Sequence, residues 1–150
     1  MAQIDQAIDV IVRGVLVSGN HILLAHAIGK ANTFLPGGHI TKGEPARDAL
    51  IREIKEETDL DAEVERYLGT IEHAWDEAGG ISHEINLVFS ISVSDIDHRL
   101  PVPSKESKLE FIWYPLERLG DSKLEPSSLR LLLPGWLSSK KEHCWASTME

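Results

Sequence analysis

"GGHITKGEPARDALIREIKEETDL" covers residues 37–60 and is the stretch that decides the fold. Helix formers dominate residues 44–58, and Pro45 stands where a first helical turn tolerates proline, so we predict a helix there. Three carboxylates, Glu53, Glu56 and Glu57, crowd near the end of this helix. Because like charges at helical spacings repel one another, the crowding needs an explanation beyond helix formation.

The three acids are predicted to face inward. At about 100° per residue, they fall in the same sector of the helix as the apolar Ala49 and Leu50. Carboxylates buried without partners are costly, and a hard cation such as Mg²⁺ or Mn²⁺ would resolve the conflict. The same residues also suit a solvated acidic helix in which Arg52 pairs with Glu56. The helix geometry alone leaves both interpretations open.

Composition and charge narrow the class of protein. The chain has 150 residues, enough for one domain with a real core, and 42% of them are hydrophobic. A formal net charge of -9 argues against binding to duplex nucleic acid or to a membrane surface, both of which favour a basic face. The lone cysteine, the lack of a basic and then apolar start, and the lack of a long apolar run together predict a cytoplasmic protein.

The rest of the pattern predicts an α/β (α+β) fold, with a mixed central sheet between helices. We expect a β-hairpin from residues 7–17 and 21–28, two strands at 62–75 and 83–93 around a turn at 77–80, a loop at 94–108 and a strand at 109–116. A second helix is predicted over 125–133, where Pro134 and Gly135 should interrupt it. The tail after about residue 140 is expected to be loose.

The full spacing of the opening stretch resembles the Nudix box of the MutT-related hydrolases, over residues 38–60. Gly38, Glu44, Arg52-Glu53 and Glu56-Glu57 match its pattern Gly-x5-Glu-x7-Arg-Glu-U-x-Glu-Glu-x-Gly-U, in which U is apolar. Asp59 alone departs, because the family has glycine there. Aspartate also visits the left-handed conformation that ends a helix, so the loop should survive the replacement.

The resemblance implies one Nudix domain over residues 1–150 that cleaves nucleoside diphosphates linked to a group X, using Mg²⁺ or Mn²⁺. By motif position, the metal ligands would be Glu53, Glu56 and Glu57, with the Gly37 carbonyl as a further ligand. Arg52 would orient a glutamate through a charge-assisted bond, and Glu44 and Gly38 would support the motif.

The general base is left open between the box and more distant acids. In some family members it is a box glutamate, here Glu53 or Glu57, and in others it lies in a distant loop. Glu106 in the loop at 94–108 resembles such a distal residue, and its alternative is a solvated loop acid. Glu110 and Glu84 are rival candidates.

Several residues are candidate substrate contacts. Trp75 would stack on a nucleobase, although a strand tryptophan packed in the core is the more common arrangement. His73 and His83 would line the same cleft, or lie partly exposed outside it. His26 and Lys30 are candidate phosphate contacts between the predicted hairpin and "LPGG" (35–38).

The substrate is inferred by elimination. A proline about fifteen residues after the box marks ADP-ribose in the family, and a slightly later tyrosine marks dinucleoside polyphosphates; here those places hold "WDEA" (75–78). A nucleoside triphosphate, oxidised or not, is therefore the first expectation. ADP-ribose, nucleotide sugars, dinucleoside polyphosphates and a non-catalytic nucleotide-binding role stay as alternatives. A homodimer is expected because dimers are common in the family.

Overall fold

The computed structural model describes residues 7–138 and 144–149. In these residues, eight strands form a mixed sheet in the order β3-β2-β1-β6-β5-β8, while β4 pairs with β1 and β7 with β2. The strands are β1 (Asp9–Ser18), β2 (His21–Ala27), β3 (Thr33–Phe34), β4 (Gly37–His39), β5 (Ala62–Glu77), β6 (Gly80–Val93), β7 (Leu109–Pro115) and β8 (Trp145–Ser147). The helices are α1 (Ala46–Thr58), the 3-10 helix η1 (Leu116–Asp121) and α2 (Leu129–Leu137).

Strand β1 joins the two halves of the sheet. It runs parallel to β6 along most of its length and antiparallel to β4. The predicted hairpin with β2 holds only beside the turn, at the pairs Val17↔Ile22 and Ser18↔His21. Beyond the turn β2 leaves β1 and pairs antiparallel with β7. The predicted hairpin is therefore confirmed next to its turn, while most residues of β1 pair with β6 and those of β2 pair with β7.

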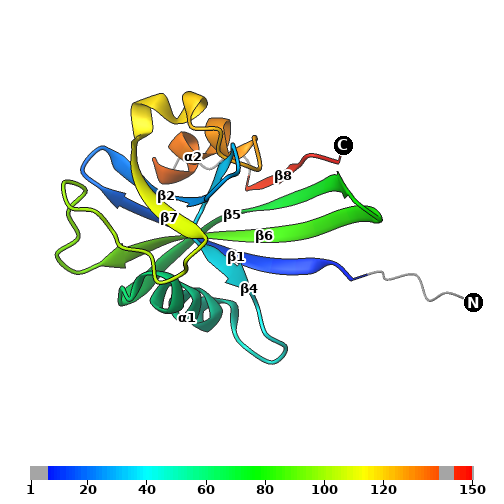
Figure 1. Cartoon of the computed structure of the whole chain (residues 1–150), viewed down its shortest axis with the longest axis horizontal. Coiled ribbons are helices and arrows are strands. Elements are labelled where there is room, and N and C mark those ends of the chain that lie inside the picture. Colours follow the sequence, from blue (N-terminus) through cyan, green and yellow to red (C-terminus); the bar gives the residue numbers. More distant parts are fainter. Residues whose placement is uncertain (1–6, 139–143, 150) are drawn as a thin grey trace, which may run out of the picture.

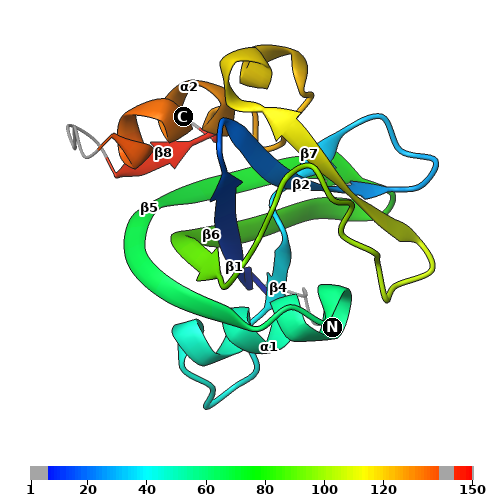
Figure 2. The same cartoon turned by 90° about the vertical axis from the view of Figure 1, so that its left-hand side faces the viewer.

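Helices cover both faces of the sheet, as predicted. Figure 1 shows α1 against one face and α2 with η1 against the other. Each face has its own core: Leu50 and Ile54 of α1 pack with Val12 of β1, whereas Leu133 and Trp136 of α2 pack with Val15. Strand β5 is long and strongly curved (Figure 2), with register shifts near Val64 and Tyr67. It therefore contributes to both cores, with Ala62 in one and Leu68 in the other.

Helix α2 differs from its prediction. It begins at Leu129 and continues through Pro134 and Gly135 to Leu137. Pro134 is exposed, while Leu129, Leu133 and Trp136 are buried on one stripe. Burial of this stripe outweighs the hydrogen bond that proline cannot donate. The proline therefore did not stop the helix, contrary to the sequence analysis.

The C-terminal tail also differs from its prediction. Residues 139–143 and 150 lie outside the described residues. After them, β8 pairs parallel with β5, from Thr70↔Trp145 to Glu72↔Ser147. The backbone N–H of Thr70 donates to the Cys144 carbonyl at 2.8 Å. The described part of the tail is thus bound to the sheet and is not loose. Among the helices that the structure describes, none is both long and apolar enough to cross a membrane.

Close packing of α2 on β5 generates a stability prediction. A Cβ atom on Gly69 would lie 2.5 Å from Cζ2 and Cη2 of Trp136, which is buried. We expect Gly69→Ala to lower the free energy of unfolding by about 1–3 kcal/mol, measured by urea denaturation. Gly120→Ala is the control, since a Cβ there meets nothing within 4 Å. Equal stability of Gly69→Ala and wild type would contradict this packing.

Candidate active site

The buried stripe of α1 ends in an acid. Ala49, Leu50 and Ile54 are buried in the core, and Glu57 follows one turn later on the same side. A plain amphipathic helix would place another apolar residue there. The residue Glu57 is only 8% exposed, so the sequence prediction of an inward-facing carboxylate holds at this position.

The Glu57 carboxylate is only partly satisfied. It accepts a hydrogen bond from the backbone N–H of Gly37, but its Oε2 atom is buried and lacks a hydrogen-bond partner. Burial, and then the negative charge of Glu53, raise the pKa of Glu57 to about 8, while Arg13 opposes the shift. An orphaned, buried carboxylate oxygen beside a second carboxylate is an environment that attracts a cation.

Two glycines make room for the acids. The Glu53 carboxylate lies against Gly38, where a Cβ atom would come within 2.7 Å of Oε1. Gly37 has a φ of +147°, and a Cβ there would collide with the carbonyl oxygen of Val12. Side chains at either position would displace the strand or the glutamate, which explains why the motif begins with glycine.

Arg52 ties the helix to the preceding loop. Its Nε and Nη2 atoms donate to the two carboxylate oxygens of Glu44 at 2.8 and 2.9 Å, and Nη2 also donates to the His39 carbonyl. Its Nη1 atom donates to Glu53 Oε1 at 3.0 Å. The bidentate bond from Arg52 lowers the pKa of Glu44 to about 2. Arg52 thus fixes both the loop and one of the inward-facing glutamates.

Glu56 is much more exposed than the other two acids. Its side chain is 55% exposed and pairs with Arg52 at 3.3 Å, so the predicted inward orientation was wrong for this residue. It sits at the edge of the helix sector, where a small rotation brings it to solvent. Among residues 7–138 and 144–149, no three His, Cys, Asp or Glu side chains lie in a group that could hold a metal ion as they stand.

The end of α1 matches its prediction. Asp59 caps the helix in the left-handed conformation, with φ 63° and ψ 11°. Beyond the cap, the backbone N–H of Lys105 donates to the Glu57 carbonyl at 2.8 Å, which brings the loop at 94–108 onto the helix end. Glu106 in this loop is exposed, and its charge contributes to the raised pKa of Glu57. The loop therefore delivers the candidate distal acid to the box.

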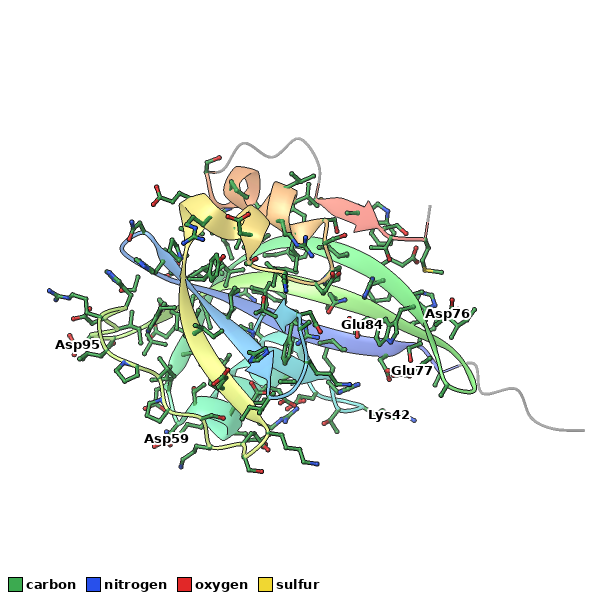
Figure 3. All side chains as sticks on the ribbon, turned by 45° about the horizontal axis from the view of Figure 1, so that its top comes forward. Lys42, Asp59, Asp76, Glu77, Glu84 and Asp95 are labelled. Carbon is green, nitrogen blue, oxygen red and sulfur yellow. The ribbon has the colours of Figure 1, made fainter. Side chains whose placement is uncertain are left out.

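A cavity of about 530 Å³ is lined by residues of β1, β3, β5 and β6. Its walls include Arg13, Lys30, Phe34, His73, Trp75 and Glu84. In Figure 3 the labelled Glu84 lies on the sheet, well away from Asp59 at the end of α1. Arg13 connects the two regions, because it lines the cavity and interacts electrostatically with Glu84, Glu57 and Glu53.

Sequence reasoning missed Arg13. Its Nε atom donates to Asn86 Oδ1 at 3.1 Å, its Nη1 atom to the Leu35 carbonyl at 3.0 Å, and its guanidinium lies 5.4 Å from the Phe34 ring centre. A single cation inside the apolar strand "DVIVRGVLVS" (9–18) was the signal that could have identified it. Fixed in this way, Arg13 presents a positive charge between the cavity and the box.

The predicted aromatic contact lies on the cavity wall. Trp75 is 38% exposed and stacks on His73, with ring centres 5.0 Å apart. The alternative of a tryptophan packed in the core was wrong for Trp75. Trp136, by contrast, is a buried packing residue. His83 does not line this cavity and lies 3.7 Å from Glu72.

The two predicted phosphate contacts, His26 and Lys30, have different surroundings. Lys30 lines the cavity, but His26 already uses both ring nitrogens: Nδ1 contacts Glu110 Oε1 at 2.7 Å and Nε2 contacts the Lys30 carbonyl at 2.6 Å. The hydrogen bond to Glu110, and then the one to the Lys30 carbonyl, raise the pKa of His26, because both oxygens accept hydrogen bonds from the protonated ring. Neither nitrogen is free for a phosphate in this arrangement. Of the rival bases, Glu110 is held by His26, whereas buried Glu84 faces the cavity and accepts from Asn86.

The donor set fits a divalent cation. Glu57 offers an unbonded buried oxygen, Glu53 lies beside it, and both are carboxylates, which hard cations such as Mg²⁺ prefer. The absence of a side chain at Gly38 leaves room beside β4 that the Glu53 carboxylate occupies. The cavity has room for a ligand, and the positive charge of Arg13 in its wall suits an anionic one.

A family model described as "NUDIX domain" matches residues 7–133. The chain belongs to the Nudix family. The Nudix box is the β4–α1 unit described above, with Glu57 at its last glutamate position and Asp59 in place of the family glycine.

Two curated relatives each match a little over half of this Nudix chain. The low-salt glycan biosynthesis protein Agl8 of Haloferax volcanii is 35% identical over 88 residues, covering 57% of this chain and 56% of that protein. The ADP-ribose pyrophosphatase of Methanocaldococcus jannaschii is 38% identical over 89 residues, covering 56% of this chain and 50% of that protein. The chain spans about half the length of the curated relatives it matches.

A solved structure supports the fold. The Nudix hydrolase from Nitrosomonas europaea superposes with a TM-score of 0.69, at 20% identity, over 90% of this chain and 92% of that chain. At this identity the likeness concerns the arrangement of strands and helices. It confirms the predicted mixed sheet between helices.

The cap of α1 generates a prediction about backbone strain. Asp59 holds a positive φ and lies 3.2 Å from Lys55 in an exposed ion pair, which contributes little. Asp59→Gly should melt no lower than wild type, whereas Asp59→Ala should melt about 2–5 °C lower. Differential scanning calorimetry measures both. Equal losses in the two variants would show that the ion pair, and not the backbone conformation, matters.

The raised pKa of Glu57 generates a prediction about pH. A carboxyl whose pKa rises from 4.5 to about 8 on folding binds fewer protons when unfolded. Without metal, the free energy of unfolding should therefore fall as the pH rises from about 4.5 to about 8, by a few kcal/mol in order of magnitude. Urea denaturation in a chelator, at several pH values, measures this slope.

Matched variants test the origin of that slope. Glu57→Gln should flatten it and should be more stable than wild type near pH 8, while the exposed Glu63→Gln should follow wild type. Millimolar Mg²⁺ or Mn²⁺ should raise the melting temperature of wild type but not of Glu57→Gln. An unchanged slope in Glu57→Gln would rule out this carboxyl as the cause.

Proposed function

We propose that this chain is a metal-dependent pyrophosphohydrolase that cleaves a nucleoside diphosphate linked to a group X, with Mg²⁺ or Mn²⁺ as its cation. The observation that carries the proposal is the buried Glu57 carboxylate, which has an unbonded oxygen and feels the negative charge of Glu53. Arg13, which lines the cavity, interacts electrostatically with both of these acids. A nucleoside triphosphate, oxidised ones included, is the first proposed substrate. Its products would be a nucleoside monophosphate and pyrophosphate.

The chain's acids divide into three roles. Glu53 and Glu57, with the Gly37 carbonyl, would hold the cation, and the exposed Glu56 would join them by turning away from Arg52. When bound, the cation supplies positive charge that neutralises phosphate oxygens and lowers the pKa of water. Arg52 keeps Glu53 in place through its bond of 3.0 Å while Glu44 anchors the guanidinium.

The cavity residues would bind and orient the substrate. Arg13 and Lys30 offer positive charge for phosphate oxygens, and Trp75 offers a face for a nucleobase. Hydrolysis forms a bond from the water oxygen to phosphorus and breaks a bridging phosphorus–oxygen bond. The water proton passes to a carboxylate, for which Glu106 is our first candidate because its loop is bonded to the end of α1. Glu53, Glu57 and Glu84 are the alternatives.

ADP-ribose is the second candidate substrate. The relative from Methanocaldococcus jannaschii that is named ADP-ribose pyrophosphatase is 38% identical over a segment of 89 residues. ADP-ribose and a nucleoside triphosphate share a base, a ribose and a charged diphosphate, so the same cavity groups suit both. The residues that contact X decide between them.

Three wider expectations accompany this proposal. We propose that residues 1–150 act as one domain, that the protein is cytoplasmic and that it forms a homodimer. The single, exposed Cys144 supports a reducing compartment. Light scattering of the purified chain tests the homodimer directly.

Product release from a nucleotide panel tests the proposed activity. The panel spans canonical and 8-oxo nucleoside triphosphates, ADP-ribose, nucleotide sugars and diadenosine polyphosphates, each with Mg²⁺ and with Mn²⁺. We expect at least one substrate to be hydrolysed, and Glu57→Gln to slow this by about 10²–10⁴-fold. Glu63→Gln is the matched control and should retain wild-type rates.

Two outcomes would count against the proposal. Equal rates in wild type and Glu57→Gln would remove the carboxylate from the reaction. No hydrolysis of any substrate, despite a metal-induced rise in melting temperature, would favour the non-catalytic nucleotide-binding role. The identity of the hydrolysed compound names X.

A further inference from the structure

The His73–Trp75 stack is an unusual surface for a sheet. Both residues lie on β5 and line the cavity, and their rings are 5.0 Å apart with an angle of 29° between planes. More than a third of the Trp75 side chain is exposed, although apolar burial would favour covering it. An exposed flat ring on a cavity wall suits a planar aromatic group of a ligand.

The C-terminal segment contacts this stack at His73. After β8, the backbone N–H of Thr148 donates to the Glu72 carbonyl at 3.0 Å, which continues the pairing with β5. The Thr148 hydroxyl then lies 2.9 Å from His73 Nδ1 and accepts the Ala74 backbone N–H at 3.4 Å. One hydroxyl thus contacts the residue beneath Trp75 and the residue between the two rings.

These contacts hold the His73 ring in place. The Thr148 hydroxyl has one hydrogen to donate and two lone pairs to accept, so it can bond to the Ala74 N–H and to Nδ1 of His73 at the same time. The bond fixes the rotation of the imidazole and, through the stack, the plane against which Trp75 rests.

Thr148 directly follows β8, whereas the box glutamates belong to α1. Figures 1 and 2 both show β8 on the side of the sheet that α2 covers, and α1 on the opposite side. An effect of Thr148 on the reaction would therefore have to pass through the cavity wall. That makes it a candidate positioning residue for substrate binding, separate from the groups that carry the chemistry.

We propose that the C-terminal segment positions the nucleobase platform of this protein, with the Thr148 hydroxyl holding His73 so that Trp75 presents its face to the base. The inference rests on the proposed function only in taking the ligand to be a nucleotide. It adds that a segment outside the Nudix box and outside the matched residues 7–133 sets base affinity.

The neighbouring Ser147 supplies a matched control. Its hydroxyl donates to Glu72 Oε1 at 2.8 Å and accepts the Met149 backbone N–H at 3.0 Å, without a bond to His73 or Trp75. Ser147→Ala therefore loosens the same segment without releasing the stack. Thr148→Val removes the hydroxyl at nearly constant volume, whereas Thr148→Ser keeps the hydroxyl and removes only the methyl group.

Binding of nucleoside 5′-monophosphates without metal tests the proposal. Isothermal titration calorimetry with AMP, GMP, CMP and UMP requires no hydrolysis. For the monophosphate that binds wild type most tightly, we expect Thr148→Val to raise Kd about three- to tenfold, and Trp75→Ala to raise it at least tenfold. Thr148→Ser and Ser147→Ala should stay within about twofold of wild type.

A double-mutant cycle separates positioning from general loosening. His73→Phe keeps a ring beneath Trp75 but removes the hydrogen-bond partner of the Thr148 hydroxyl, so Thr148→Val should have no further effect in that background. With a hydrolysed substrate, Thr148→Val should raise KM and leave kcat unchanged. Far-UV circular dichroism and the melting temperature check that each variant is folded.

The outcomes distinguish this inference from the proposed function. If the binding series follows expectation while no substrate is hydrolysed, the positioning role of Thr148 is supported and the proposed activity is contradicted. If hydrolysis occurs but Thr148→Val binds like wild type, or weakens binding no more than Ser147→Ala, the positioning role is overturned. Absence of binding by every monophosphate to wild type would also overturn it.

Discussion

The Glu57 carboxylate lies on the buried stripe of α1, with one hydrogen bond from the Gly37 N–H and one oxygen without a partner. An apolar residue would complete the stripe begun by Leu50 and Ile54 at no electrostatic cost. The acid instead carries a desolvation penalty, which the nearby charge of Glu53 increases. We propose that a bound cation offsets this penalty, which would explain why an acid stands at this position.

The surroundings of Glu57 are arranged to keep this charge in place. Gly37 and Gly38 allow β4 to pass close to the helix, because any side chain there would strike Val12 or Glu53. Arg52 binds Glu44 and Glu53 together, so the loop before α1 cannot move independently of the acid pair. Within the Nudix box, the glycines thus provide space for the acids, and Arg52 holds Glu53 in that space.

The cavity has a different origin. Its walls come from segments far apart in the chain: Arg13 from β1, Lys30 and Phe34 from around β3, and His73 and Trp75 from β5. Strand β1 makes this possible, since it pairs with β6 and β4 on one half of the sheet and with β2 on the other. Arg13 lies at that junction, within the electrostatic influence of Glu57 and Glu84.

Local sequence determined the helix, its acids and its left-handed cap at Asp59, because helix period, glycine placement and capping act over a few residues. The same local signals identified β1, β2, β5, β6 and β7 but not the short strands β3, β4 and β8. The resemblance of residues 38–60 to the Nudix box indicated the family. Tertiary structure decided what local signals cannot encode. It paired β1 with β6 in preference to β2, carried α2 through Pro134, turned Glu56 outward and placed Trp75 on a cavity wall. It also laid the C-terminal segment beside β5. These features depend on which distant surfaces are buried together, and only the assembled core sets that choice.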